Sequence, residues 1–218
     1  MKKVVISIGG SLINPGKLNT HFLKELKQVL KKYKGKMVLV TGGGYIAREY
    51  MHPFKRAQQE SLIGIQCTQL HARLLSLVLK DTEVIPETWE ELKKQVKKER
   101  VVICGGFKEG VGMTSDGTSA EIAKLIHADL FINMTNAKGL YTKDPKKYKD
   151  AKLISYISHE AFKEMIDTHH ERPGQHFVLD QHAAKVCKEQ NISVIILTGT
   201  KNLKNVLQKK PFIGTLIS

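Results

Sequence analysis

Three glycine clusters each stand directly behind a short apolar run, a position in which glycine is suited to binding phosphate. The clusters are Gly9-Gly10-Ser11, Gly42-Gly43-Gly44 and Gly105-Gly106, with Gly110 and Gly112 a little further on. Glycine lets backbone N–H groups approach phosphate oxygens, and the N-terminus of a following helix adds positive potential. Because ligands of open parallel sheets bind beyond the carboxyl ends of the strands, we expect the three loops to converge on one phosphorylated ligand.

The chemistry that this pattern indicates is phosphoryl transfer by several loops acting together. None of the clusters is followed by Lys-Ser or Lys-Thr, which excludes a P-loop, and none has the GxGxxG spacing of dinucleotide-binding folds. Arg48 lies about one turn into the helix expected after Gly44, where a guanidinium group can bind a phosphate through two hydrogen bonds. Positioning and charge neutralisation provide most of the catalysis in phosphoryl transfer, so no protein nucleophile is required.

Strands and helices alternate along the chain and place these loops. Apolar, β-branched runs predict strands at 4–8, 37–40, 83–85, 101–104, 130–135, 193–197 and 212–217. Apolar residues at helical spacing predict helices at 19–34, from about 46, and at 60–80, 87–98, 116–127, 158–168, 179–189 and 201–208, with a basic loop at 139–150. This order predicts an α/β fold, a three-layer αβα sandwich with a mainly parallel central sheet. No linker is visible, so residues 1–218 are expected to form one domain.

The composition is that of a soluble globular protein, with 41% hydrophobic and 26% charged residues among 218. No apolar run reaches the roughly 18 residues that a membrane-spanning helix needs, so no membrane association is expected. The N-terminal apolar run is broken by Gly9-Gly10 and lacks a cleavage signal, and we interpret it as a strand and not a signal peptide. Cys67, Cys104 and Cys187 lie in apolar surroundings without a CxxC pair, which favours reduced, buried thiols and a cytoplasmic location.

The chain is strongly basic, with 35 Lys and Arg against 21 Asp and Glu and a net charge of +14. Much of the excess lies in two predicted helices, within 24–36 and 93–100, and the simplest interpretation is that these lysines form solvated helix surfaces. Aromatic residues make up only 6% of the chain, which is few for a surface on which single-stranded bases stack. The sequence therefore argues against nucleic acid as the partner.

An ordered set of motifs resembles the amino acid kinase superfamily and, within it, the archaeal-type uridylate kinases. The motifs are ISIGGSL, VTGGGYIAR, GGF, TSDG, TNAKGLYTKDP, LDQHAAK and GTLI, and they span residues 4 to 217. The resemblance implies an αβα sandwich that transfers the γ-phosphoryl group of ATP to UMP with Mg²⁺, a step of pyrimidine nucleotide biosynthesis. It also implies a cytoplasmic homo-hexamer, with an acceptor-side lobe at roughly 1–130 and an ATP-side lobe at roughly 131–218.

The resemblance also implies roles for individual residues. The residues matched to the ATP site are Gly9, Gly10, Ser11, Gly44, Arg48, Thr135, Asn136, Tyr141 and Asp144. The residues matched to the UMP site are Gly43, Ser61, Thr114, Ser115 and Asp116. The catalytic positions are matched by Gly10, Arg48 and Lys185, and Lys185 would neutralise charge on the phosphoryl group in transfer. No protein cage for a metal is implied, because Mg²⁺ is commonly held by substrate phosphates and one or two oxygen ligands.

Several acceptor-side positions depart from the family pattern. Ser61 replaces the aspartate that binds ribose, with Glu60 beside it, and Gln69 and His71 replace an arginine and an asparagine. The loop at 107–113 is about two residues longer than in the family. His176, in the loop before the Lys185 helix, is a further candidate near the acceptor. These changes bear on the identity of the acceptor and not on the kinase chemistry.

Three further positions also differ from the family. Ser7 replaces a lysine that many superfamily members carry, although archaeal-type relatives also lack it, Lys138 replaces an aspartate, and Gln181-His182 replaces Pro-Leu. Lys138 would either add a phosphate contact or alter a surface loop.

Two other hypotheses are compatible with the sequence. The first is a kinase of the same superfamily that phosphorylates another small, phosphorylated acceptor. The second is a non-catalytic nucleotide- or nucleic-acid-binding protein that keeps the fold without turnover. Considered singly, Arg48 and Asp116 could be surface residues near helix starts, and Lys185 a solvated lysine on an amphipathic helix. Retention of Lys185, the glycine loops and Asp144 favours an enzyme, since a protein without turnover has no need of charges that act in the transition state.

Overall fold

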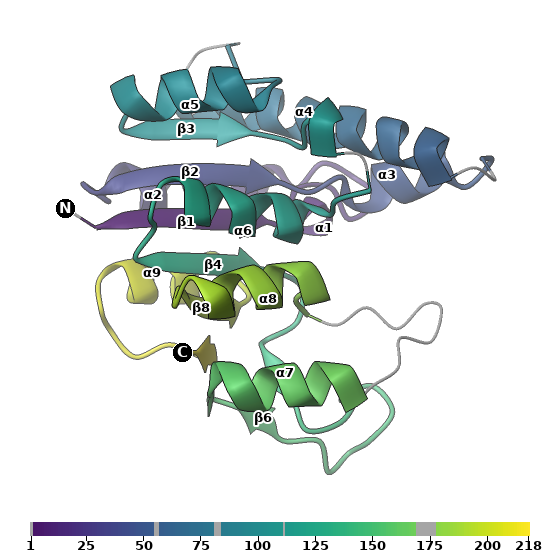
Figure 1. Ribbon diagram of the computed structural model, residues 1–218, viewed down its shortest axis with the longest axis vertical. Coiled ribbons are helices and arrows are strands. Elements are labelled where there is room, and N and C mark those ends of the chain that lie inside the picture. The colour runs from purple at the N-terminus through teal and green to yellow at the C-terminus, as the bar shows by residue number, and fades with distance from the viewer. Residues whose placement is uncertain (1, 55–56, 81–83, 111, 169–177) are drawn as a thin grey trace.

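The protein is known from a computed structural model that describes residues 2–54, 57–80, 84–110, 112–168 and 178–218. Its centre is a seven-stranded sheet in the order β3-β2-β1-β4-β8-β9-β7 (Figure 1). These strands are β1 (Lys3–Ile8), β2 (Lys36–Thr41), β3 (Val101–Cys104), β4 (Leu130–Met134), β7 (Tyr156–Ile157), β8 (Ser193–Leu197) and β9 (Gly214–Ile217). The run from β3 to β8 is parallel throughout, and β9 pairs antiparallel with β8.

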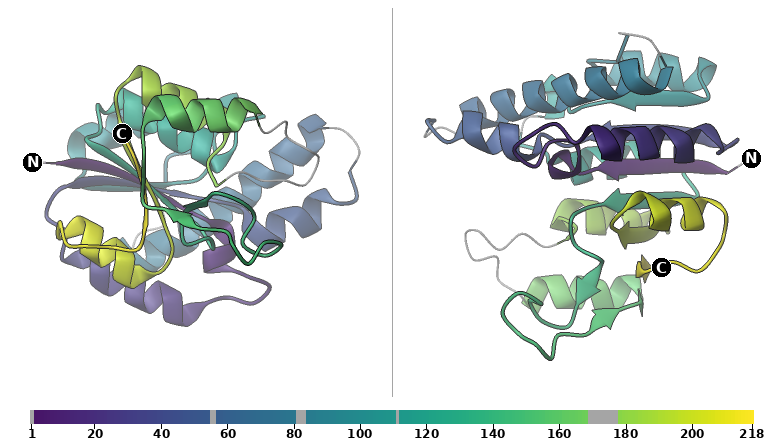
Figure 2. Two further views of the ribbon diagram at one scale, coloured as in Figure 1. Left: turned by 90° about the horizontal axis from the view of Figure 1, so that it is seen from below. Right: turned by 180° about the vertical axis from the view of Figure 1, so that it is seen from behind.

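Helices cover both faces of the sheet (Figure 2). The helices are α1 (Gly10–Ile13), α2 (Thr20–Lys31), α3 (Gly44–Met51), α4 (Ala57–Lys80), α5 (Trp89–Lys98), α6 (Ser115–Leu125), α7 (His159–Thr168), α8 (Gln181–Glu189) and α9 (Thr200–Leu207). The strands are apolar on both faces: Val4 and Ile6 pack with α2, α4 and α9, while Val5 packs with α5, α6, α7 and α8. The predicted αβα sandwich with a mainly parallel sheet is confirmed.

The ends of the parallel strands lie in register, and this brings the loops that follow them to one edge. Ile8, the last residue of β1, pairs with Thr41 at the end of β2 and with Met134 at the end of β4. Met134 in turn pairs with Leu197 at the end of β8, and Cys104 at the end of β3 is one residue short of this line. The three glycine clusters therefore share the carboxyl edge of the sheet, as predicted.

Some short elements differ from the sequence expectation. The segment 139–150 was expected to be a loop, but β5 (Leu140–Tyr141) pairs there with β6 (Leu153–Ile154) in a two-stranded sheet. The expected strand at 83–85 is wrong for Val84 and Ile85, and residue 83 lies outside the described part of the chain. Strands of two residues leave almost no periodic signal, because their pairing is set by tertiary neighbours.

Helix α4 corrects the expectation that no segment is apolar enough to cross a membrane. The stretch Gln59–Lys80 passes on length and composition alone, with a mean hydropathy of 1.3. Core helices of soluble domains pass the same test, and 44% of the window is buried inside the protein. Ala72 and Leu75 of α4 are fully buried against the sheet, so its apolar character is explained in part by packing within the fold.

All three cysteines are free thiols in buried positions, as predicted. Cys104 is fully buried at the end of β3. Burial raises the pKa of its thiol well above the ordinary value, and burial likewise raises the pKa of Cys187 to about 12. A thiol that stays protonated is a weak nucleophile, so Cys104 acts as a small core residue.

Candidate active site

The first two glycine loops interlock at the carboxyl edge of the sheet. Gly42 N–H donates to the carbonyl of Ile8, the last residue of β1, at 2.9 Å, which ties the second loop to the strand that leads into the first. A Cβ added to Gly10 would lie 2.3 Å from the Gly42 carbonyl oxygen and 2.4 Å from the Gly44 nitrogen. Gly44 has a φ of +61°, and its own Cβ would lie 2.3 Å from the Gly10 carbonyl carbon. Only glycine allows the two backbones to approach this closely.

Arg48 extends from α3 over the first loop. Its Nη2 donates to Ser11 Oγ at 3.3 Å, and its side chain is exposed to solvent. Among the described residues it has no carboxylate partner within ion-pair distance, so its charge is available to a ligand. Gly9 N–H donates to the Met134 carbonyl at 2.9 Å and ties the first loop to β4. The structure therefore brings together Gly9, Gly10, Ser11, Gly43, Gly44 and Arg48.

Helix α6 begins beside this junction. Thr114 caps the helix, because its hydroxyl oxygen accepts from Gly117 N–H at 3.0 Å. A Cβ added to Gly42 would lie 3.3 Å from Ser115 Oγ, which places the start of α6 against the second glycine loop. The N-terminus of α6 thus adds positive potential at the loop junction.

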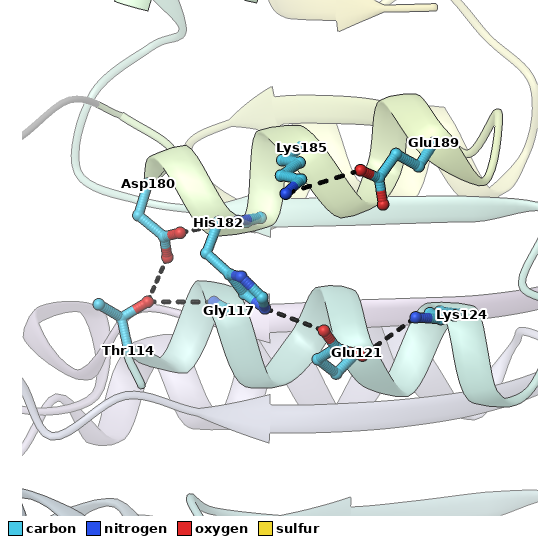
Figure 3. Close-up of polar contacts among 9 residues, drawn as sticks. Thr114, Gly117, Glu121, Lys124, Asp180, His182, Lys185 and Glu189 are labelled. Atoms are coloured by element: carbon cyan, nitrogen blue, oxygen red, sulfur yellow. Dashed lines mark hydrogen bonds and ion pairs between the residues drawn. The ribbon is translucent and has the colours of Figure 1, made fainter. Parts of the chain in front are cut away.

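Helix α8 begins next to α6, and the two caps are joined (Figure 3). The Thr114 hydroxyl donates to an oxygen of Asp180, and Asp180 caps α8 by accepting from Ala183 N–H at 2.7 Å. In the first turn of α8, His182 Nε2 lies 2.9 Å from Glu121 Oε1 of α6. Asp180 was not among the residues expected in the site, although an aspartate just before a helical pattern is a recognised start signal.

Asp116, expected to contact UMP, has both carboxylate oxygens bound by the protein. Ser7 Oγ donates to Oδ1 at 3.0 Å, and Asn133 Nδ2 donates to Oδ2 at 2.9 Å. Burial raises the pKa of Asp116 to about 7, and the charge of Asp180 adds to this, while the two hydrogen bonds oppose it. Ser7 and Asn133 were not expected as site residues, and both are fully buried polar positions within apolar strands. Asp116 therefore holds β1, β4 and α6 together beneath the loops.

This raised pKa predicts that stability falls as pH rises. A folded-state pKa of about 7 exceeds the ordinary aspartate value of 3.8, so the folded protein binds an extra proton between these values. The resulting stabilisation is fully present below about pH 4 and is lost as pH rises through about 7. In urea unfolding measured from pH 4 to pH 8, the contribution of Asp116 to the free energy of unfolding should fall by about a few kcal/mol at most. We expect Asp116→Asn to remove this pH dependence.

Asp150→Asn is the matched control, because Asp150 is an exposed carboxylate paired with Lys143 at 2.7 Å. This variant should keep the wild-type dependence of the unfolding free energy on pH. A parallel pH dependence in wild type and Asp116→Asn would show that Asp116 is ionised throughout the range.

The Ser61 hydroxyl is engaged by the acceptor loop. Its Oγ accepts from Gly112 N–H at 2.8 Å, and Gly112 has a φ of +88°. The serine thus holds the part of the acceptor loop that carries Gly112. Val111 and His176 lie outside the described residues.

The residues matched to adenosine lie beyond β4. Thr135 N–H donates to the Leu197 carbonyl at 3.0 Å, and its hydroxyl donates to Asn136 Oδ1 at 3.4 Å. Tyr141 lies in β5, and Asp144 Oδ1 accepts from Lys146 N–H at 2.9 Å in a turn. Lys138 is exposed. These residues lie at the carboxyl end of β4 and in the β5–β6 hairpin, and Thr135 borders the first glycine loop, since a Cβ added to Gly9 would lie 3.8 Å from the Thr135 Cα.

Lys185 lies in the second turn of α8 (Figure 3). Its side chain is 70% exposed, and Nζ lies 3.9 Å from Glu189 Oε1, one turn further from the carboxyl edge. Within the described ranges no hydrogen bond joins Lys185 to a glycine loop. The long side chain has the freedom to turn toward the edge when a phosphate draws it there.

Comparison with known proteins agrees with this arrangement. The sequence pattern of the amino acid kinase family matches residues 2–198. Uridylate kinases from Archaeoglobus fulgidus and Methanoregula boonei are each 33% identical, over 99% and 95% of this chain and 100% and 92% of theirs. The crystal structure of uridylate kinase from Archaeoglobus fulgidus superimposes with a TM-score of 0.87, at 30% identity and full coverage of both chains.

Proposed function

The chain belongs to the amino acid kinase family, and we propose that it is a uridylate kinase that converts UMP and ATP to UDP and ADP. The observation that carries the proposal is the junction of the two interlocked glycine loops, with Arg48 above it and the N-terminus of α6 beside it. This geometry suits two phosphate groups held close together. The names of the archaeal relatives indicate UMP as the acceptor.

The reaction is a direct in-line transfer. An oxygen of the UMP phosphate attacks the γ-phosphorus of ATP, the bond from that phosphorus to the bridging oxygen breaks, and ADP leaves with the electron pair. The attacking oxygen is already anionic, so no protein base takes part. The protein aligns the two phosphates and neutralises their charge, which is the principal requirement of this chemistry.

The two substrates would occupy neighbouring parts of the carboxyl edge. In the proposal Gly9, Gly10, Ser11 and Gly44 hold ATP phosphates, and the β5–β6 side holds adenosine through Thr135, Asn136, Tyr141 and Asp144. Gly43, Thr114 and Ser115 hold the UMP phosphate on the acceptor-side lobe, roughly 1–130. Arg48 serves the transferred group, and Lys185 neutralises it in the transition state.

Magnesium would enter as the complex with ATP. The described part of the chain contains no group of three or more His, Cys, Asp or Glu residues able to hold a metal ion. Asp116 is bound by Ser7 and Asn133, and Asp180 caps α8 and accepts from Thr114. Mg²⁺ keeps several waters and binds mainly through phosphates in such enzymes, so MgATP is written as the donor substrate.

A second candidate is a kinase of the same family with a different phosphorylated acceptor. Ser61 favours it, because the Ser61 hydroxyl accepts from Gly112 and provides no free carboxylate for a ribose. Everything at the glycine junction would serve that kinase equally well.

We also propose that the chain assembles into a homo-hexamer in the cytoplasm. Leu62, Leu70 and Leu77 are 41%, 57% and 43% exposed, and at 3.6 residues per turn they fall within about 80° of one another around α4. An exposed apolar side of this kind is a favourable contact surface between copies of a chain. Light scattering in solution would measure the assembly.

The test of function is ADP release from the purified protein with MgATP and a panel of acceptors. The panel comprises UMP, CMP, dUMP, AMP, isopentenyl phosphate, aspartate, glutamate and N-acetylglutamate. We expect turnover with UMP at least about tenfold above any other acceptor, in the range of about 1–100 per second typical of kinases. A preference for another phosphorylated acceptor would favour the second candidate. ATP binding without turnover on any acceptor would contradict both.

A further inference from the structure

The middle of α4 contacts two glycine loops through its side chains. His71 Nδ1 lies 2.8 Å from the carbonyl oxygen of Gly42, in the loop that follows β2. Gln69 Nε2 donates at 3.1 Å to the carbonyl of Gly106, in the loop that follows β3. Thr68 Oγ1 accepts from Gly106 N–H at 2.7 Å. One helix thus fixes the peptide groups of both loops.

The second ring nitrogen of His71 has no hydrogen-bond partner among the described residues. The residue is 2% exposed, and this atom, Nε2, is buried. A carbonyl oxygen accepts hydrogen bonds and does not donate, so Nδ1 carries the proton in the bond to Gly42. Leaving a buried polar atom unpaired is unfavourable, which indicates that the bond at Nδ1 has a compensating role.

The planarity of the peptide bond shows what that role is. The Gly42–Gly43 peptide is trans, since none of the described peptide bonds is cis. In a trans peptide the carbonyl and the N–H point in opposite directions. Because the Gly42 carbonyl points to His71, the Gly43 N–H points away from α4. Within the described segments no acceptor binds that N–H.

We propose that His71 is a positioning residue that orients the Gly42–Gly43 peptide and so aims the Gly43 N–H at the acceptor phosphate. Gln69 does the same for the peptide that follows Gly106. This inference rests on the proposed function, because it assumes a phosphate at the junction. It also explains a departure from the family pattern: an asparagine amide nitrogen can take the place of Nδ1, so histidine preserves the donor and adds only the unpaired Nε2.

The test compares substitutions that keep the donor with substitutions that remove it. His71→Asn keeps a nitrogen donor near the Nδ1 position, and His71→Leu removes it at similar size. UMP binding is measured by titration calorimetry, and KM and kcat by ADP release. We expect His71→Leu to weaken UMP binding and raise KM about tenfold, the effect of one lost hydrogen bond, with kcat changed much less. His71→Asn should stay within about twofold of wild type.

His159→Leu is the matched control. His159 is also a buried histidine with an unpartnered Nε2, but it lies at the start of α7, away from the glycine loops. The His159→Leu substitution should lower the Tm and leave UMP binding unchanged. If His71→Leu does not fold, His71→Gln is used in its place. The glutamine amide lies one bond further from the backbone than the asparagine amide, so the His71→Gln variant should bind UMP more weakly than the His71→Asn variant.

The outcomes separate this inference from the proposed function. Equal UMP binding by wild type and His71→Leu would overturn the positioning role and leave the kinase proposal intact. Equal losses in His71→Leu and His71→Asn would also overturn it. If wild type binds UMP but transfers no phosphoryl group to it, the proposed function fails, while the ranking of the variants in calorimetry still decides the inference. Absence of both UMP and ADP binding to wild type would overturn both.

Discussion

Replacing Gly10 by alanine is expected to reduce kcat/KM for UMP by at least about 100-fold, because the two glycine loops can no longer interlock. The new Cβ would lie 2.3 Å from the Gly42 carbonyl oxygen and 2.6 Å from the Gly43 carbonyl carbon. These neighbours are backbone atoms, which cannot rotate away as the end of a flexible side chain can. One loop must therefore move, and a displacement of about 1 Å is enough to misalign two phosphates.

Gly10→Ala should also lower the free energy of unfolding. Thermal unfolding is therefore measured alongside steady-state kinetics, so that a loss of stability is distinguished from a loss of activity. Gly64→Ala is the control, because a Cβ there meets only the flexible Met51 Sδ at 3.1 Å. This control should keep both activity and Tm near wild type. Gly44→Ala attacks the junction from the other side, with a φ of +61° and the Gly10 carbonyl carbon 2.3 Å away. A Gly10→Ala enzyme with wild-type kcat/KM would show that the loops do not act as a unit.

The five parallel strands could be predicted from sequence because their residues carry the signal locally. Strands β3 and β8 have the predicted bounds, 101–104 and 193–197, and each end of β1, β2 and β4 was placed within one residue. Residues buried on both faces of a sheet must be apolar nearly throughout, and this pattern is visible in a single chain. The two-residue strands β5, β6 and β7 were missed because their neighbours in space, and not their own residues, decide that they pair.

The glycine junction could be predicted, but the hydrogen bonds beneath it could not. Glycine clusters after parallel strands must share an edge, so topology alone brings Gly10 and Gly44 together. The contact of Asp116 with Ser7 and Asn133 joins three elements that are far apart in sequence, and its geometry is set by packing. A signal was nevertheless present, because Ser7 and Asn133 each interrupt an apolar strand, and buried polar side chains need hydrogen-bond partners.

The acceptor-side departures also acquire physical explanations from the structure. Ser61 binds the loop that carries Gly112, and His71 binds the carbonyl of Gly42. Both were identified in the sequence only as replacements of expected side chains. Their partners are backbone groups of glycine loops, which leave no trace in the side-chain pattern. The side chains at these two positions therefore help to hold the glycine loops in place.

Lys185→Ala is expected to lower kcat by about 10²- to 10³-fold while UMP and ATP affinities stay within about threefold. The side chain is 70% exposed, and its one ion pair among the described residues is with Glu189 at 3.9 Å, so it adds little to the folded structure or to a ground-state pocket. A charge that meets the phosphoryl group only during transfer lowers the barrier without strengthening substrate binding. Single-turnover rates and calorimetric affinities, measured on the same preparation, separate the two effects.

Lys188→Ala provides the control from the same helix. Lys188 lies 3.5 Å from Glu160 of α7, one turn from Lys185, and its loss removes the same charge from α8. Kinetics should remain near wild type in this variant, because its side chain serves the packing of α7 on α8. If both lysine variants lose turnover equally, the effect comes from the general field of a basic helix. Equal losses of kcat and of substrate affinity in Lys185→Ala would instead identify Lys185 as a binding residue.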